Sequence, residues 1–242
     1  MKYALQLYSI RDHIKTGDDM LEMLGKVKEA GYQGVEFAGF FGLSGETLRA
    51  RLDELGLVCV GAHCGLDDFD EDKLAQTLRT ARALGTPNIG IGGASTGNEK
   101  DLQKVLDIMG KAQKIADGSG IKVYFHNHTG EFAPTKGDTS GGKTIFERIM
   151  EACYIQVDTY WSFHAGIDTP VYLEQHKDRI ATVHLKDGID GTPKALGEGQ
   201  NDVRAIIKKC DELGIEWGIV ENDDPEPCGI EDVTRSIRWL LA

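Results

Sequence analysis

Short apolar segments recur through the chain about 30 residues apart, and this repeat is the strongest constraint on the fold. The eight segments are YALQLY (3–8), GVEF (34–37), LVCVGAH (57–63), NIGIGG (88–93), KVYFHNH (122–128), YIQVD (154–158), IATVHLKD (180–187) and WGIVEN (217–222). The segments between them, such as DEDKLAQTLRTARALG, have helical periodicity, and several end in Gly. The chain therefore reads as a strand followed by a helix, repeated eight times.

This strict alternation predicts parallel strands joined by right-handed crossovers. Eight repeats of this length favour a closed (β/α)8 barrel, the TIM barrel, and an open sheet of eight strands is the alternative. The 242 residues contain no polar linker, so we expect a single TIM-barrel domain spanning residues 1–242.

The composition argues against nucleic acid and membranes as binding partners. The formal net charge of −12 argues against nucleic acid, because affinity for the phosphate backbone depends on Lys and Arg. The first residues, MKYALQLYSIRDHIK, contain no apolar run long enough for a signal peptide or a membrane span, so we expect a cytoplasmic protein without a membrane partner. The five cysteines show no CxxC spacing, which indicates reduced thiols.

Polar and ionisable residues close most of the predicted strands. In a barrel of this kind, chemistry takes place at the carboxyl ends of the strands. Any one of these residues alone is more often a hydrogen-bonded structural group, but a barrel brings all its strand ends to one rim. Burying unpaired carboxylates there would cost several kcal/mol, so we expect a cation among them. The residues are Gln6, Tyr8, Glu36, His63, His126, His128, Asp158, His184, Lys186 and Glu221.

Four of these residues form a candidate metal site. His126, Asp158, His184 and Glu221 close four strands that are neighbours in a barrel. Two imidazoles and two carboxylates suit a divalent transition metal. A metal-free acid/base cluster is the alternative interpretation.

Several motifs resemble those of the xylose isomerase-like barrels, which include sugar and sugar-phosphate isomerases, epimerases and inosose dehydratase-like enzymes. The motifs are GVEF, GAHCGLDDF, YFHNHTGEF, IQVDTYW, VHLKD, ALGEG (195–199) and IVEND. They occur in the family's order and spacing over essentially the whole chain.

The resemblance implies a metal held by an acid on strand five, Asp on strand six, His on strand seven and Glu on strand eight. The last three positions match Asp158, His184 and Glu221. His126 stands where the family's ketose epimerases have a metal-bound Glu, so one of their two proton-transferring bases is missing. More nitrogen and less negative charge among the ligands favour Mn, Co, Zn or Fe over Mg.

This site predicts removal of a proton from the carbon next to a metal-polarised carbonyl. We expect a sugar or sugar-phosphate isomerase or epimerase, and the alternative is a dehydratase (lyase) acting on keto-sugars or inososes. Glu221 is the candidate base, with Glu131 and His128 as partners from the loop after strand five. Glu131 is equally well explained as a solvated loop charge.

Other residues are candidates for contact with a small-molecule sugar. Glu36 and His63 would bind hydroxyl groups, and Lys186 would bind an oxyanion or phosphate unless it forms a salt bridge instead. Trp161 offers an apolar face for a sugar ring, with burial in the core as the alternative. Glu198, in a glycine-rich loop, is a weaker candidate.

Residues 137–144, GDTSGGKT, match the phosphate-binding loop of nucleotide-binding proteins. That loop needs an apolar strand directly before its first Gly, and here HTGEFAPTK precedes it. We therefore interpret the match as chance and residues 133–142 as a mobile loop over the barrel mouth. The alternative is that this segment has a function, in which Lys143 or the Gly amides would bind a phosphate group of the substrate.

Two rival functions remain. A nuclease of the apurinic-site class shares the barrel, but it needs a larger metal cluster and a basic face, which the negative charge disfavours. A non-catalytic sugar-binding barrel would be expected to lose the ligand set. The oligomeric state is open, a homo-oligomer included.

Overall fold

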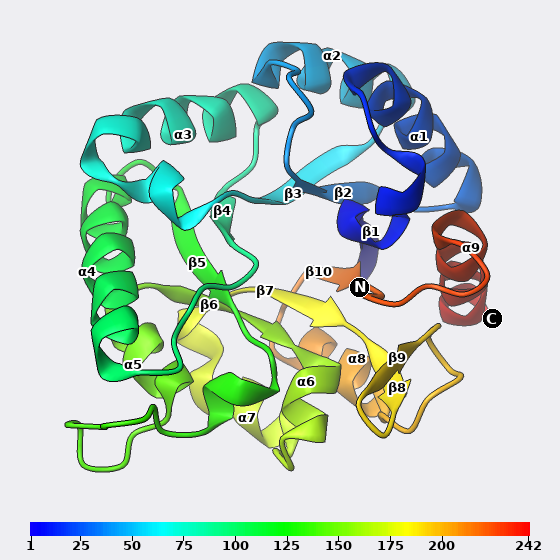
Figure 1. Cartoon of the computed structure of the whole chain (residues 1–242). Helices are drawn as coiled ribbons and strands as arrows, with labels where there is room; N and C mark the ends of the chain where they lie inside the picture. The colour runs from blue at the N-terminus through cyan, green and yellow to red at the C-terminus, as the bar shows by residue number, and fades with distance from the viewer.

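The computed structural model describes residues 1–242, and its centre is a closed barrel of eight parallel strands (Figure 1). Each barrel strand pairs with the barrel strands before and after it in the chain, and the last pairs with the first. This confirms the predicted (β/α)8 TIM barrel. The strands are β1 (Lys2–Gln6), β2 (Gly34–Ala38), β3 (Val58–His63), β4 (Asn88–Ile91), β5 (Lys122–His126), β6 (Tyr154–Asp158), β7 (Ile180–Leu185) and β10 (Trp217–Val220).

Helices cover the outside of the barrel (Figure 1). Several begin at a side chain that caps the first turn: Thr16, Ser44 and Asn98 each accept a hydrogen bond from a backbone N–H three residues later. None of the helices is both long and apolar enough to cross a membrane. The α-helices are α1 (Gly17–Ala30), α2 (Gly45–Leu55), α3 (Glu71–Leu84), α4 (Glu99–Ala116), α5 (Ile145–Ala152), α6 (Thr159–His164), α7 (Thr169–His176), α8 (Val203–Glu212) and α9 (Gly229–Leu241), and the 3-10 helices are η1 (Leu7–His13), η2 (Leu66–Phe69), η3 (Thr129–Phe132) and η4 (Lys177–Arg179).

The core has two parts. The large one packs the helices against the outer faces of the strands. The small one lies on the inner face of the strands, inside the barrel. It consists of Ala4, Val60 and Ile219, with Trp217 packed against them. Because side chains alternate between the two faces of a strand, residues two positions further along point to the same side. Gln6 and Glu221 therefore follow Ala4 and Ile219 into the barrel, where its polar groups gather.

A small antiparallel hairpin follows β7. It consists of β8 (Asp187–Ile189) and β9 (Thr192–Lys194). The predicted seventh strand, 180–187, therefore ends earlier, at Leu185. The Asp187 carboxylate accepts backbone N–H bonds from Gly197 and Gly199, both at 3.0 Å, which ties the glycine-rich loop to the hairpin.

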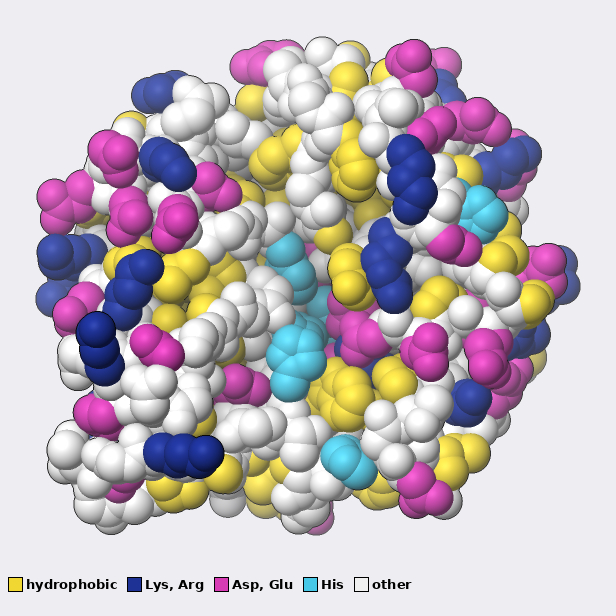
Figure 2. All heavy atoms as spheres, viewed as in Figure 1, with side chains coloured by type: hydrophobic (Ala, Val, Ile, Leu, Met, Phe, Trp, Pro, Cys, Tyr) yellow, Lys and Arg dark blue, Asp and Glu magenta, His cyan; other side chains and the backbone are white.

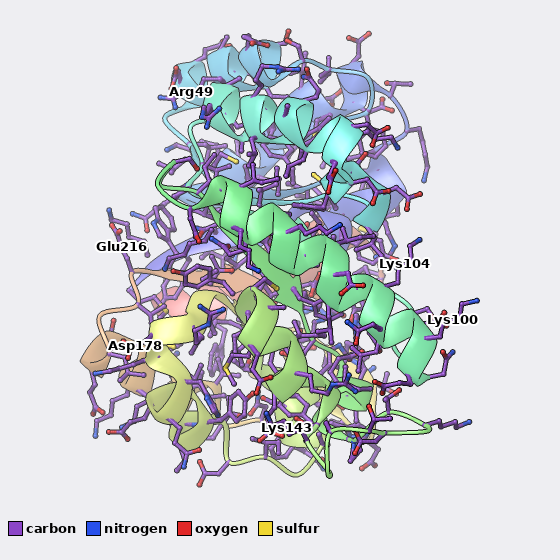
Figure 3. All side chains as sticks on the ribbon, turned by 90° about the vertical axis from the view of Figure 1, so that its left-hand side faces the viewer. Arg49, Lys100, Lys104, Lys143, Asp178 and Glu216 are labelled. Carbon is purple, nitrogen blue, oxygen red and sulfur yellow. The ribbon has the colours of Figure 1, made fainter.

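The GDTSGGKT segment forms a turn that is closed by hydrogen bonds to Asp138. The Asp138 carboxylate accepts backbone N–H bonds from Ser140 and Gly142, both at 2.8 Å. The Lys143 ammonium pairs with Glu151 on the flank of the barrel (Figure 3). The backbone amides of Ser140 and Gly142 and the Lys143 ammonium thus already have anionic partners within the chain. This supports the interpretation that the motif match is due to chance.

The loop of residues 133–142 does not cover the barrel mouth, contrary to expectation. It lies at the edge of the molecule, at the lower left of Figure 1, and none of its residues lines the central pocket. Its anchors explain this position, because Thr139 donates a hydrogen bond to Glu99 at the start of α4. Arg148 in α5 binds the same carboxylate through two nitrogens, at 2.7 and 2.8 Å.

Candidate active site at the barrel mouth

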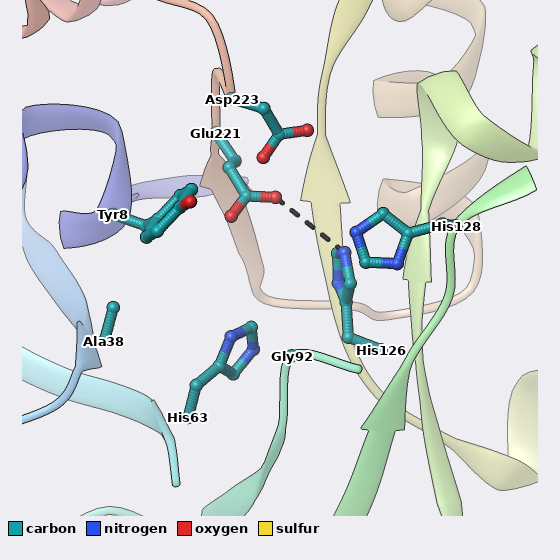
Figure 4. Close-up of a pocket in the computed structure, with 8 residues that line it drawn as sticks. All are labelled: Tyr8, Ala38, His63, Gly92, His126, His128, Glu221 and Asp223. Atoms are coloured by element: carbon teal, nitrogen blue, oxygen red, sulfur yellow. Dashed lines mark ion pairs between the residues drawn. The ribbon is translucent and has the colours of Figure 1, made fainter. Parts of the chain in front are cut away.

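A pocket of about 480 Å³ opens at the carboxyl ends of the strands. Figure 2 shows it as a hollow at the centre of the visible face, with histidine side chains gathered inside it. Figure 4 shows Glu221 and His126 facing each other across it. The lining residues are Tyr8, Ala38, His63, Gly92, His126, His128, Glu221 and Asp223.

The four predicted metal ligands come together at this pocket, and two of them, His126 and Glu221, belong to its lining. One donor atom from each of His126, Asp158, His184 and Glu221 lies within 4.8 Å of the others, and all four side chains are buried. Bonds of about 2.0–2.2 Å place the ligand atoms of one tetrahedral ion roughly 3.5 Å apart, so small movements would let all four reach a single ion. The donor set therefore fits a divalent cation.

The start of α6 holds Asp158 in place. Its Oδ1 accepts the backbone N–H groups of Tyr160 and Trp161, at 3.0 and 2.9 Å, and so caps this helix. Its Oδ2 forms no such hydrogen bond and instead makes an ion pair with the Lys186 ammonium at 2.9 Å. One carboxylate oxygen is thus fixed by the backbone, and the other faces the ligand set.

The His184 ring lies between two carboxylates. Its Nε2 is 2.5 Å from Glu36 Oε2, and its Nδ1 is 2.8 Å from Glu221 Oε2. Burial alone would lower the pKa of His184, but these carboxylates raise it to about 10. Burial alone would raise the pKa of Glu36, but His63 and His184 lower it to about 2. At neutral pH His184 is therefore protonated and Glu36 ionised, and the two form an ion pair.

Glu36 lies below the pocket instead of lining it. Its side chain is fully buried, and Oε1 accepts hydrogen bonds from Tyr124 at 2.6 Å and Gln156 at 2.7 Å. Oε2 accepts a bond from Gln6 at 2.7 Å in addition to that of His184. With both oxygens engaged, Glu36 orients His184, as outer groups commonly do for a metal-binding imidazole.

Gln156 sets the orientation of two further imidazoles. Its Nε2 donates to Glu36 and Thr182, so its Oε1 must be the acceptor for His126 Nδ1 at 3.0 Å and His63 Nε2 at 2.8 Å. This assigns the proton of His126 to Nδ1 and leaves the lone pair of Nε2 directed at the ligand set. Burial and the neighbouring His184 lower the pKa of His126 well below its usual value, so the ring is neutral.

Lys186 is a buried cation within this site. Its Nζ lies 2.9 Å from Asp158, 2.7 Å from Glu221 and 2.7 Å from Asp223. Burial acts to lower the pKa of Lys186, but the three carboxylates raise it. The four carboxylates of the site, Glu36, Asp158, Glu221 and Asp223, face only two buried cations, Lys186 and His184, so a formal excess of two negative charges remains. This excess grows to three when His184 is neutral, as a ligating imidazole is, and a divalent ion would reduce it to one.

Some predicted site residues lie at the pocket and others do not. His128 lines the pocket, with its ring 5.0 Å from that of His126. Trp161 lies behind it, where its Nε1 donates to Asp223 at 3.3 Å. Its ring centre is 5.6 Å from the Lys186 ammonium. Trp161 is therefore part of the wall that holds Lys186.

Glu131 and Glu198 lie outside the pocket lining. Glu131 is buried, and its carboxylate accepts bonds from the Thr96 hydroxyl at 3.1 Å and the His128 backbone N–H at 2.8 Å. It is thus neither a solvated charge nor part of the lining, but it fixes the segment that carries His128. Glu198 pairs with Arg235 at 2.8 Å on the surface.

The sequence-based prediction missed two groups of residues. Tyr124 and Gln156 stand two positions before His126 and Asp158, and strand alternation alone could have placed them inside the barrel. Asp223 lies in the loop after β10, and only its proximity to Lys186 reveals its role.

The chain belongs to the xylose isomerase-like TIM barrel family, whose sequence model matches residues 24–242. Inosose dehydratase from Geobacillus kaustophilus is 25% identical over 77% of this chain and 68% of its own. A sugar phosphate isomerase/epimerase from Parabacteroides distasonis superposes with a TM-score of 0.83 at 22% identity, covering 100% of this chain and 96% of its own. A crystal structure of IOLI protein with a bound zinc atom has a TM-score of 0.73 at 14% identity, covering 100% and 97%.

Proposed function

We propose that this protein is a metal-dependent enzyme that removes a proton from the carbon next to a carbonyl group of an uncharged keto-sugar or inosose. The observation that carries the proposal is the Glu221 carboxylate. It belongs to the four-donor cluster and at the same time lines the pocket in which a substrate would lie. Family membership supports the same class of reaction.

His126, Asp158, His184 and Glu221 would hold the ion. Two imidazoles favour Mn, Co, Zn or Fe over Mg, and the zinc in a protein of the same fold agrees with this choice. When bound, such an ion polarises a carbonyl and makes the neighbouring C–H more acidic. Occupancy requires His184 to give up its proton, since a ligating imidazole is neutral.

Glu221 is the proposed base. Burial acts to raise the pKa of Glu221, but Lys186 and His184 lower it well below the usual range, so the carboxylate is ionised. In the metal-free site, His184 Nδ1 lies 2.8 Å from its Oε2, and in the loaded site both groups would instead be ligands of the ion. This geometry leaves the group oriented toward the pocket and ready to accept a proton.

Loss of water is the outcome we favour. The C–H proton passes to Glu221, the C–H electron pair forms a double bond, and the β-hydroxyl leaves with a proton donated by His128. His128 suits this role because it lines the same pocket as Glu221 and lies at the exposed rim. The curated relatives, which are inosose dehydratases, support this outcome.

Aldose–ketose isomerisation is the second candidate. It needs one base to remove a proton and return it to the adjacent carbon, and the site provides one metal-bound Glu. The isomerase/epimerase from Parabacteroides distasonis supports this candidate through its fold. Epimerisation would need a second base on the opposite face of the substrate, where His126 offers a ligand nitrogen instead.

The lining of the pocket supports an unphosphorylated substrate. None of its residues is Lys or Arg. The ammonium of Lys186 is engaged by three carboxylates. At the rim, Arg11 stacks on Tyr8 and donates to the backbone oxygens of Tyr8 and Asp223. A phosphate would therefore meet acidic groups and no uncommitted cation.

Solvent exchange tests the proposal. The metal-loaded protein is incubated in D2O with an inosose, a 3-keto sugar and a ketose, and NMR follows both deuterium uptake and loss of water. We expect exchange with dehydration for one of the first two, and its loss in Glu221→Gln. Glu198→Gln, at a surface ion pair, is the matched control. Absence of exchange with every substrate would refute the enzyme proposal and favour passive sugar binding.

A further inference from the structure

A second cluster of metal-binding side chains lies outside the active-site pocket. Asp12 and His13 end η1, and Cys228 directly precedes α9. One donor atom from each lies within 4.8 Å of the others, and all three residues are at least partly exposed. None of them lines the pocket or belongs to the four-donor cluster.

Two distant parts of the chain build this cluster by close packing. The Gly229 backbone N–H donates to Asp12 Oδ2 at 3.0 Å, which fixes that carboxylate beside Cys228. A Cβ at Gly229 would lie 2.5 Å from the Ser9 carbonyl oxygen and 2.7 Å from Ile10 Cα, so only glycine permits the approach. The donors are therefore held together by the fold, although they come from opposite ends of the sequence.

We propose that Asp12, His13 and Cys228 form a second metal site that binds zinc. A thiolate, an imidazole and a carboxylate are typical zinc ligands, and water would complete a tetrahedron. Zinc bonds of about 2.0–2.3 Å require ligand atoms roughly 3.5 Å apart. His13 Nε2 and Asp12 Oδ2 are already 3.4 Å apart. The half-exposed side chains have room for the remaining movement.

The position of the site implies a structural role. It joins the segment after β1 to the segment between β10 and α9, where the first and last strands close the barrel. The same two segments are linked nearer the pocket by Arg11, which donates to the Asp223 carbonyl oxygen at 2.7 Å. Zinc bound here would stabilise this closure without contact with the substrate.

Metal titration of the full chain tests the site. The variant background is Asp158→Asn with His184→Ala, which disables the four-donor cluster. After removal of metals, this protein should still bind one equivalent of zinc at micromolar concentration. Cys228→Ser and His13→Ala should each weaken that affinity at least tenfold, and Cys64→Ser, at the other partly exposed cysteine, should not. Replacement of zinc by Co²⁺ should give thiolate-to-cobalt absorption that Cys228→Ser abolishes.

Three results would overturn the inference: no zinc uptake by this background at micromolar concentration, equal uptake after Cys228→Ser, or uptake without thiolate-to-cobalt absorption. Protection of Cys228 from alkylation gives an independent reading, since bound zinc should slow its modification and leave that of Cys64 unchanged. Every result is independent of catalytic activity, so the site stands or falls separately from the proposed function.

Discussion

Lys186→Met replaces the buried ammonium of the active site by an apolar side chain of similar length. The ammonium lies within 2.9 Å of carboxylate oxygens from Asp158, Glu221 and Asp223. Removing one partner of a buried ion pair costs about 3–5 kcal/mol, because the remaining charges lose their compensation. At about 2–4 °C per kcal/mol for a chain of this size, the melting temperature of the metal-stripped protein should fall by about 6–20 °C.

A bound divalent ion should reverse part of this loss. Lys186 and the ion would share the oxygens of Asp158 and Glu221, and two cations in one site repel each other. The Lys186→Met variant should therefore bind the ion about tenfold more tightly or better, which corresponds to about 1.4 kcal/mol or more. Since binding to the folded state adds stability, the difference from wild type should narrow when metal is present.

The assay is thermal and chemical denaturation of both proteins after EDTA treatment and again with saturating Mn²⁺ or Zn²⁺. Lys143→Met is the matched control, because its ammonium pairs with Glu151 at the surface with 49% of the side chain exposed. That change should cost less than about 1 kcal/mol in either condition. A Lys186→Met deficit no larger than that of the control, or one that metal leaves unchanged, would refute the reasoning.

Three further predictions concern pH, packing and nucleotide binding. The raised pKa of His184 stabilises the EDTA-treated protein fully below about pH 6.5, and denaturation should show this contribution disappearing as pH rises through about 10. Gly90→Ala should lower stability by about 1–3 kcal/mol in the same assay, because its Cβ would lie 2.1 Å from the Tyr124 carbonyl oxygen, whereas Gly97→Ala, with open space around it, should be nearly neutral. Calorimetry should detect no ATP binding to wild type or Lys143→Ala, and binding lost in that variant would restore the nucleotide-loop reading.

The barrel was predictable because its signals are local. Gly31, Gly56 and Gly85 each end a helix in the left-handed conformation that glycine adopts at least cost, with φ of 114°, 62° and 74°. Apolar segments of strand length separate these helices. The hairpin β8–β9 was missed because its strands have three residues each and depend on the distant contacts of Asp187.

The gathering of the four candidate ligands was also predictable from strand order. His126 and Glu221 are 95 positions apart in the sequence, but parallel strands of a barrel end at one rim and bring them together. The surroundings of the cluster required the structure. Glu131 finds its partner Thr96 in another loop, and Glu198 finds Arg235 in α9. No local sequence pattern indicates such pairings, so the roles of the Glu131 and Glu198 carboxylates could not be predicted from the sequence.

Asp223 is a site residue that the sequence did not indicate. It lies two residues after Glu221, in the loop that follows β10, so the strand pattern of the sequence does not extend to it. Its contacts with Lys186 and Trp161 make it a wall of the pocket. Lys186 was expected to contact either substrate or a salt-bridge partner, and the structure places it in three ion pairs.

Elemental analysis of the purified protein tests the central claim most directly. The measurement is made in a Cys228→Ser background, so that the second cluster does not contribute, and compares the parent with Asp158→Asn and His184→Ala. We predict close to one equivalent of Mn, Co, Zn or Fe in the parent, its loss in both variants, and its retention in Glu198→Gln. Equal metal content in parent and variants, or no uptake by the parent after incubation with each metal, would contradict the four-ligand site.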